Sequence, residues 1–152
     1  MDCGCYASPI GWVQVTVTSA GVASLQFVDE SAAGVKAEGI LGAALSQLEE
    51  YFTGKRRTFD LPLALAGTDF QRAVWQHLLT IPYGQTTSYG EVAQAIGRPM
   101  AVRAAGAANG RNPIAIIVPC HRVVGADGSL TGYGGGLWRK EWLLRHEGAR
   151  LT

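Results

Sequence analysis

The chain has 152 residues, of which 47% are hydrophobic and 16% charged. This composition supports one domain, or a large domain with a small N-terminal appendage, and it excludes a disordered chain. No apolar run reaches the roughly 18 residues of a membrane-spanning helix, and we expect neither a membrane span nor a signal peptide. Three cysteines do not make a disulfide framework, which favours a reducing, cytoplasmic compartment.

The net charge of +1 hides an asymmetry along the chain. The first 60 residues carry seven acidic and four basic side chains, and the remainder carries five acidic and nine basic ones. Between Glu91 and Asp127 there are four arginines and no acid. Such a stretch suits a polyanion, because neutralising phosphates releases counterions. A solvated basic face is the alternative interpretation.

Two kinds of hydrophobic pattern occupy the first part of the chain. Residues 12–18 and 22–28 alternate around a short turn, which predicts a β-hairpin. Leucines and Phe52 recur at helical spacing over residues 41–52, which predicts an amphipathic helix that ends near Gly54. Residues 61–65 alternate across a proline, which favours an edge strand or an extended linker. We therefore predict an N-terminal α/β domain over residues 1–66.

The remaining residues, 67–152, form the second predicted domain, which is mainly helical. Thr68 with Gln71 marks a helix start, and Ser88 with Glu91 marks another, because each pair matches the capping-box pattern. The second of these helices stops near Gly97, and a third follows over about residues 101–109. Two short helices around a tight turn resemble a helix-turn-helix.

The third helix carries Arg103 among tiny residues, which include Ala104 and Ala105. A helix that reads the major groove needs long polar side chains to reach base edges. Tiny residues with one arginine allow close approach without sequence readout, which suits the minor groove. The alternative is that the small residues only let helices pack closely.

A candidate nucleophile follows the longest apolar run of this domain. Ile114–Val118 predicts a buried strand, and Pro119 ends it. Cys120 and His121 come next, and a nearby histidine or a basic field can lower the pKa of a thiol. Neighbours in an extended segment point to opposite faces, so His121 needs a local bend or a bridging water to reach Cys120. A buried, inert cysteine is the alternative.

The last predicted helix covers about residues 137–146 and ends beside Glu147. A carboxylate at this end is disfavoured by the helix dipole, so a specific partner is expected. His121 is the candidate, because a carboxylate that orients an imidazole is the arrangement found in hydrolytic triads.

The run Pro119–Val123, with Asn112-Pro113 before it and Gly132-Tyr133 and Lys140 after it, resembles the O6-alkylguanine-DNA alkyltransferases. The resemblance covers nearly all of residues 67–148, and the N-terminal part more loosely. It implies a small ribonuclease-H-like α/β domain followed by a helical DNA-binding domain with a helix-turn-helix. It also implies DNA repair, in which O6-alkylguanine is flipped out of duplex DNA and its alkyl group passes irreversibly to the protein.

The family's functional residues can be carried over to matching positions. The resemblance implies that Cys120 accepts the alkyl group and that His121 and Glu147 activate it through a water. It implies that Asn112 braces the turn between the recognition helix and the active site. The other implied site residues are Tyr89 as donor to the leaving guanine, Arg103 as the finger that fills the stack, Ala104 and Ala105 at the docking face, and Tyr133, Gly134 and Lys140 around the pocket.

The expected partner is double-stranded DNA, bound in its minor groove by a monomer that can act cooperatively, and no cofactor is expected. Some relatives hold zinc in the N-terminal part with cysteine and histidine ligands. Here Cys3 and Cys5 have no histidine near them, because the first histidine in the chain is His77, so we predict no metal. Three other functions are alternatives. A non-enzymatic relative would lack the acceptor cysteine. A transcription regulator would carry long polar recognition residues, and a cysteine hydrolase would leave the basic helix unexplained.

Overall fold

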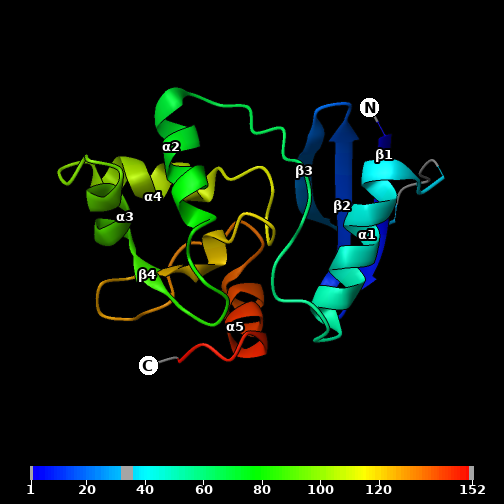
Figure 1. Ribbon diagram of the computed structural model, residues 1–152. Coiled ribbons are helices and arrows are strands. Elements are labelled where there is room, and N and C mark those ends of the chain that lie inside the picture. Colours follow the sequence, from blue (N-terminus) through cyan, green and yellow to red (C-terminus); the bar gives the residue numbers. More distant parts are fainter. Residues whose placement is uncertain (1, 32–35, 151–152) are drawn as a thin grey trace. The chain divides into compact units, whose positions relative to one another are not determined.

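The structure is a computed structural model that describes residues 2–31 and 36–150. It divides into two compact units, Met1–Ala66 and Gly67–Thr152 (Figure 1). In the described ranges, no helix is long and apolar enough to span a membrane.

The N-terminal unit is built on an antiparallel sheet of strands β1 (Asp2–Ser8), β2 (Gly11–Thr18) and β3 (Gly21–Val28), paired in that order. The β2–β3 hairpin confirms the prediction from the alternating pattern. Strand β1 was missed, because a strand with glycine at its buried position shows no alternation of large apolar and polar residues. A side chain at this glycine, Gly4, is disfavoured, because a Cβ there would lie 3.2 Å from the Leu45 side chain.

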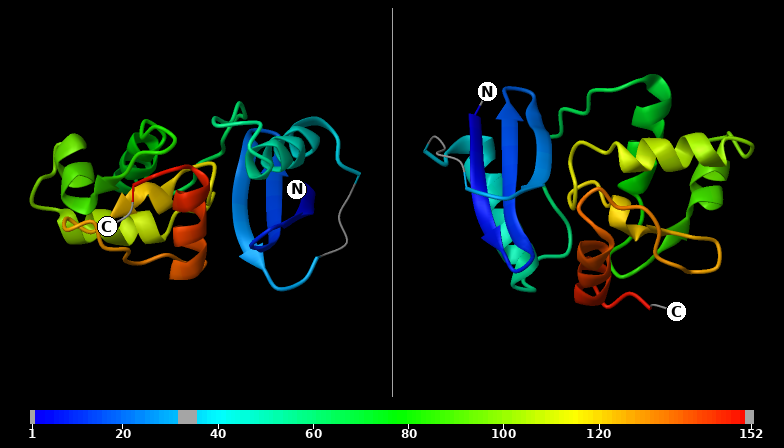
Figure 2. Two further views of the ribbon diagram at one scale, coloured as in Figure 1. Left: turned by 90° about the horizontal axis from the view of Figure 1, so that it is seen from below. Right: turned by 180° about the vertical axis from the view of Figure 1, so that it is seen from behind.

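Helix α1 (Gly39–Phe52) lies across one face of this sheet, as Figures 1 and 2 show from three directions. The predicted helix over residues 41–52 is thereby confirmed, and the chain leaves it at Gly54, which has a positive φ of 79°. Leu41 and Leu48 of the helix are buried together with Val13 and Val15 of β2. The spacing of apolar residues thus matches the two periods, 3.6 in the helix and 2 in the strand, that bury one face of each element.

The extended segment that follows α1 runs back along the outer edge of β3. Its contact is an isolated parallel bridge between Val22 and Leu63, with Val22 N donating to the Pro62 carbonyl at 2.8 Å. The segment approaches Gly21 so closely that a Cβ there would lie 2.4 Å from the Pro62 oxygen. Of the two predicted alternatives, the edge interaction is therefore the observed one, limited to a single bridge.

The C-terminal unit is mainly helical. Its elements in chain order are α2 (Asp69–Leu78), β4 (Thr87–Ser88), α3 (Tyr89–Ala95), α4 (Val102–Gly110), the 3₁₀ turn η1 (Cys120–Arg122), β5 (Val123–Val124) and α5 (Leu137–His146). The capping box of Thr68 and Gln71 is complete in both directions. At α3 only half of the predicted box forms, because the Glu91 carboxylate accepts from the Ser88 hydroxyl and not from the backbone.

Helices α3 and α4 pack against each other and against α2, and Figures 1 and 2 show them grouped at one end of the unit. The turn between them contains Gly97 with φ 76°, a conformation that glycine adopts without strain. Helix α4 is tied to α2 by the Trp75 indole, which donates to the Ala108 carbonyl at 2.8 Å. This arrangement is the predicted helix-turn-helix, and it buries the small residues Ala105 and Ala108.

The predicted buried strand Ile114–Val118 is wrong in form, although its side chains are largely buried as expected. The segment is a turn in which Val118 N donates to the Ile114 carbonyl at 3.0 Å and Ile116 has a positive φ of 71°. An apolar run indicates burial but does not by itself distinguish a strand from a compact turn. The ordered strands nearby are the two-residue pair β4 and β5, which are parallel.

We expect Gly21→Ala to lower the free energy of unfolding by about 3 kcal/mol, because the added Cβ collides with the Pro62 carbonyl at a backbone conformation that disfavours alanine. The control is Gly54→Ala, which also has a positive φ, of 79°, but no atom within 4 Å of the added Cβ, and it should cost about 1 kcal/mol. Urea denaturation followed by circular dichroism measures both. Equal losses in the two variants would contradict the close approach of the segment to Gly21.

Candidate active site

The Cys120 thiol lies in the 3₁₀ turn η1, directly after Pro119. The turn is the local bend that sequence reasoning required, because it replaces the extended backbone in which Cys120 and His121 would point to opposite faces. Cys120 is 7% exposed and His121 is completely buried. The nucleophile candidate therefore sits just beneath the surface, with its neighbour in the interior.

Asn112 holds the segment that leads into this turn. Its amide nitrogen donates to the Val118 carbonyl at 2.7 Å, and its Oδ1 accepts from Ile114 N at 3.0 Å. One side chain thus supplies both a donor and an acceptor where a strand would have supplied ladder hydrogen bonds. Asn112 thereby ties residues 114 and 118 of this segment together.

Glu147 caps the end of α5 and binds two neighbouring residues of η1. One carboxylate oxygen lies 2.8 Å from His121 Nε2, and Arg122 makes two contacts of 2.8 and 2.9 Å with the carboxylate. Burial alone would raise the pKa of Glu147, but hydrogen bonds and positive charge from His121 and Arg122 hold it well below its usual value. The carboxylate therefore stays ionised. The unfavourable helix dipole at this end predicted one partner for Glu147, and the structure contains two, His121 and Arg122.

Arg122, one of the four arginines between Glu91 and Asp127, has a structural role that the sequence reasoning missed. Besides Glu147, its guanidinium donates to the Ile81 carbonyl at 2.7 Å, and its Cζ lies 5.8 Å from the centre of the Tyr83 ring. It is thus a clamp between α5 and the loop after α2. One feature of the sequence could have indicated this pairing, because a buried carboxylate at a helix end is stabilised by a bidentate arginine as readily as by a histidine.

Lys140 is buried, and its ammonium group is surrounded by backbone carbonyls. It donates to Val123 at 2.5 Å and to Thr131 at 2.6 Å, and lies 3.5 Å from the Gly132 oxygen. Burial lowers the pKa of Lys140 to about 8, against the opposing pull of Cys120. This cation fastens the loop of residues 131–132 to β5, beside the thiol.

The protonation of Cys120 is a balance between burial and nearby donors. Burial raises the pKa of the Cys120 thiol, whereas the Asn112 side chain and the positive charge of Lys140 oppose that rise. Tyr133 belongs to the same neighbourhood, because burial and the negative charge that Cys120 carries once ionised together raise the pKa of its phenol well above its usual value. The thiol is protonated in the resting site, so a base is needed to activate it.

Tyr89, the first residue of α3, faces the same loop. Its hydroxyl donates to the Thr131 carbonyl at 3.0 Å and accepts from the Thr131 hydroxyl at 3.1 Å. Lys140 Nζ lies 6.0 Å from the centre of its ring. The geometry therefore brings together Cys120 and most of the predicted set, namely His121, Glu147, Asn112, Lys140, Tyr133 and, through Thr131, Tyr89.

Four predicted contact residues lie outside this cluster, on α4 and in the loop that contains Gly134. Arg103 and Ala104 are exposed on α4, and no described residue pairs with the Arg103 side chain. Ala105 is buried, which differs from its predicted place at the contact face, because successive residues of a helix are turned by about 100°. Gly134 is exposed, and a Cβ there would meet nothing within 4 Å.

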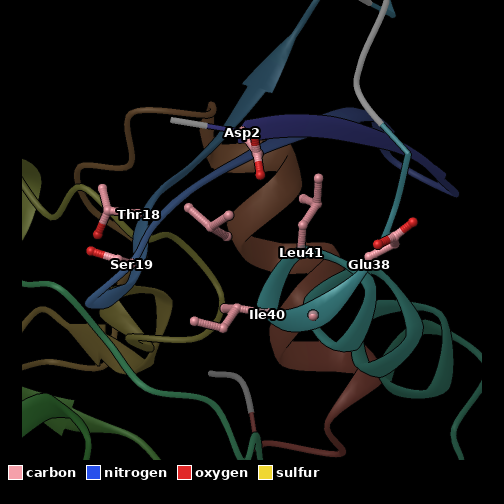
Figure 3. A pocket seen from close by; sticks show the side chains of 8 residues that line it. Asp2, Thr18, Ser19, Glu38, Ile40 and Leu41 are labelled. Carbon is pink, nitrogen blue, oxygen red and sulfur yellow. The ribbon is translucent and has the colours of Figure 1, made fainter.

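The N-terminal unit has a cavity of about 450 Å³ of its own, shown in Figure 3. It is lined by the end of β2 and the start of α1, with Asp2, Thr18 and Glu38 among its polar residues. None of the predicted site residues lines it. Cys3 and Cys5 are free thiols on β1, and within residues 2–31 and 36–150 no three potential metal ligands lie together.

Comparisons with known proteins identify the family. Residues 1–65 match the model of the 6-O-methylguanine DNA methyltransferase ribonuclease-like domain, and residues 69–149 match that family's DNA-binding domain. The chain belongs to this family. Its fold class, a small α/β domain and a helical domain with a helix-turn-helix, is thereby confirmed, as is its activity as a DNA repair methyltransferase.

Individual relatives agree over most of the chain. The methylated-DNA–protein-cysteine methyltransferase of Mycobacterium leprae is 51% identical, over 97% of this chain and 92% of the relative. The crystal structure of Mycobacterium tuberculosis OGT in complex with DNA has a TM-score of 0.87 at 48% identity and covers 96% of this chain and 92% of its own. S. pombe Atl1 in complex with damaged DNA containing O6-carboxymethylguanine covers 58% of this chain and 83% of its own, with a TM-score of 0.51 at 29% identity.

We expect Glu147→Gln to lower the free energy of unfolding at neutral pH by about 3 kcal/mol, because it breaks a buried charge pair. The folded-state pKa of Glu147 is depressed, so its contribution is present above the unfolded-state value of 4.5 and is lost as the pH falls below it. The difference between wild type and variant should therefore narrow toward about pH 3.

Urea denaturation at neutral and acidic pH measures this difference. The control is Glu141→Gln on the same helix, which removes an exposed ion pair with Arg145 and should change stability little. A difference that stays constant between the two pH values would show that Glu147 does not act as a buried carboxylate.

Proposed function

We propose that this protein restores guanine in DNA by moving the alkyl group of O6-alkylguanine onto Sγ of its own Cys120, once per molecule. The observation that carries the proposal is the η1 turn. It places the Cys120 thiol beside the Lys140 cation and the Asn112 amide, and makes His121 its immediate neighbour in the chain. Membership of the family supports the reaction, and this geometry supports the assignment of residues.

The resting thiol needs a base, and His121 has the right state for it. Burial lowers the pKa of His121 in spite of the Glu147 carboxylate, so the ring is neutral at neutral pH. Because Glu147 is ionised, the nitrogen facing it, Nε2, carries the hydrogen, and Nδ1 keeps the basic lone pair. Nδ1 then accepts the Cys120 proton through a water, and Glu147 stabilises the imidazolium that results.

The transfer itself is an in-line displacement. The Cys120 thiolate attacks the alkyl carbon, a sulfur–carbon bond forms, and the bond from that carbon to O6 breaks. The electron pair remains on guanine, which then takes up one proton. Tyr89 would donate a hydrogen bond to the departing base, for which its hydroxyl exchanges the Thr131 carbonyl for guanine. A thioether has no easy route of hydrolysis, so the protein does not return to its starting state.

The recognition surface that we propose is the exposed side of α4. Arg103 and Ala104 lie there, and the absence of long side chains other than Arg103 would let the helix enter a minor groove closely. Attack on a base inside a duplex is sterically blocked, so the nucleotide has to be flipped out, with Arg103 filling the vacated stack. The complex of the related M. tuberculosis protein with DNA supports DNA as the partner.

Intact-protein mass spectrometry after incubation with a duplex that contains O6-methylguanine tests the reaction. We expect a gain of one methyl group, located on Cys120, and no gain in Cys120→Ala, which should still bind DNA. The control is Cys5→Ala, because Cys5 is a free thiol in the other unit and its loss should leave the gain unchanged. Methyl release over several turnovers would favour a hydrolase, and an unchanged mass would reject the transfer.

The finger role of Arg103 predicts a loss that depends on the substrate. Arg103→Ala should slow transfer from duplex DNA by about 30-fold, which corresponds to about 2 kcal/mol of lost compensation for unstacking. Transfer from free O6-benzylguanine, which needs no flipping, should change less than about twofold. Single-turnover rates on the two substrates measure the contrast, and equal losses on both would exclude a finger.

A further inference from the structure

A buried polar side chain of α4 contacts the nucleophile's own backbone. Asn109 is 3% exposed, and its amide nitrogen donates to the Cys120 carbonyl at 3.4 Å. It did not stand out in the sequence, where it is one polar residue in a helix of alanines and glycines. Burial of an amide is costly unless its polar atoms are satisfied, so this residue needs an explanation beyond packing.

Two buried atoms beside the peptide bond between Cys120 and His121 lack a partner among the described residues. They are Asn109 Oδ1 and His121 Nδ1. The amide of Asn109 contacts the carbonyl of that peptide bond, and the ring of His121 is carried by its second residue. Buried polar atoms in native proteins nearly always have a partner, from protein or from ordered water.

Both orphaned atoms are acceptors, which determines what can satisfy them. Asn109 Nδ2 points at a carbonyl and must be the donor end of the amide, so Oδ1 accepts. His121 Nε2 carries its hydrogen toward Glu147, so Nδ1 accepts as well. Two acceptors cannot bond to each other. A water has two hydrogens to give, one to each atom, and two lone pairs left to accept a further donor.

We propose that Asn109 is a positioning residue of the alkyl transfer, which orients through its Oδ1 the water that relays the Cys120 proton to His121 Nδ1. With one hydrogen given to Oδ1 and the other to Nδ1, the lone pairs of the water face the thiol. The sulfur–hydrogen proton passes to the water as the water passes its own proton to Nδ1. The water is regenerated, the imidazolium forms, and the thiolate is free to attack carbon.

The inference rests on the alkyl transfer proposed above and adds a group that acts through water on His121. The charged or titratable groups around the relay are Lys140 and Glu147 from α5, Arg122 from η1 and Tyr133 from the loop. Asn109 of α4 is uncharged, so replacing it leaves the charges around the relay unchanged. A change in pH dependence on its removal therefore reports on the relay and not on lost charge.

The test is the rate–pH profile of Asn109→Leu with free O6-benzylguanine, which excludes DNA binding from the measurement. Leucine has the same number and branching of side-chain heavy atoms as asparagine and removes both polar ends. We expect a loss of at least about tenfold in the single-turnover rate at neutral pH. The reason is that the water would no longer be oriented to accept the thiol proton, and a positioned proton acceptor contributes this much or more. The rates of variant and wild type should converge at high pH, where the thiol ionises without the relay.

The matched control is Trp75→Phe, which removes the hydrogen bond from the indole to the Ala108 carbonyl, one residue before Asn109 on the same helix. It should lower the thermal midpoint but leave the shape of the rate–pH profile unchanged. A profile of Asn109→Leu that follows that of Trp75→Phe, with no shift toward higher pH, overturns the proposal.

A crystal structure of the unmodified wild-type protein, at a resolution that reveals ordered water, is a second measurement that needs no variant. We expect one water within hydrogen-bond distance of both Asn109 Oδ1 and His121 Nδ1. A water that contacts only one of them, or a protein donor on Oδ1, overturns the proposal even if Asn109→Leu does not fold. Failure of the wild type to gain mass on Cys120 would instead reject the alkyl transfer itself.

Discussion

Glu147 uses both carboxylate oxygens to hold the turn that carries Cys120, with His121 on one side and the Arg122 guanidinium on the other. Because Arg122 also donates to the Ile81 carbonyl, one ion pair joins the end of α5, the loop after α2 and the η1 turn. A buried ion pair contributes little net stability when compared with apolar packing. Its value here is geometric, since a turn of three residues has few hydrogen bonds of its own.

Structural contacts of this kind also explain how a buried site holds several charges. Lys140 keeps its cation near the thiol because three carbonyl oxygens surround it, and those carbonyls belong to β5 and to the loop of residues 131–132. Each charge of the candidate site is thus also a structural tie. A substitution at Lys140 or Glu147 changes the position of the loop or the turn together with the electrostatics, so loss of activity alone does not separate the two effects.

Local signals in the sequence predicted those elements whose residues interact with near neighbours. The α1 helix, the β2–β3 hairpin and the Thr68 capping box depend on spacing and on turn residues, and the structure contains all three. The segment of residues 114–118 went wrong because its apolar character reports burial, whereas its shape depends on the Asn112 side chain. Arg122 and Asn109 were missed because their partners lie 25 and 11 residues away.

Helix α4 shows how the proposed recognition surface and the Cys120 thiol can be held in a fixed relation. Arg103 and Ala104 lie on its exposed side, while Ala105, Ala108 and Asn109 are buried on the other. The buried side is fastened twice, by Trp75 to the Ala108 carbonyl and by Asn109 to the Cys120 carbonyl. Large side chains on the buried face would push the helix away from both anchors. The small residues on the buried side therefore keep α4 close to α2 and to the turn that carries Cys120, while the exposed side offers the surface proposed for DNA.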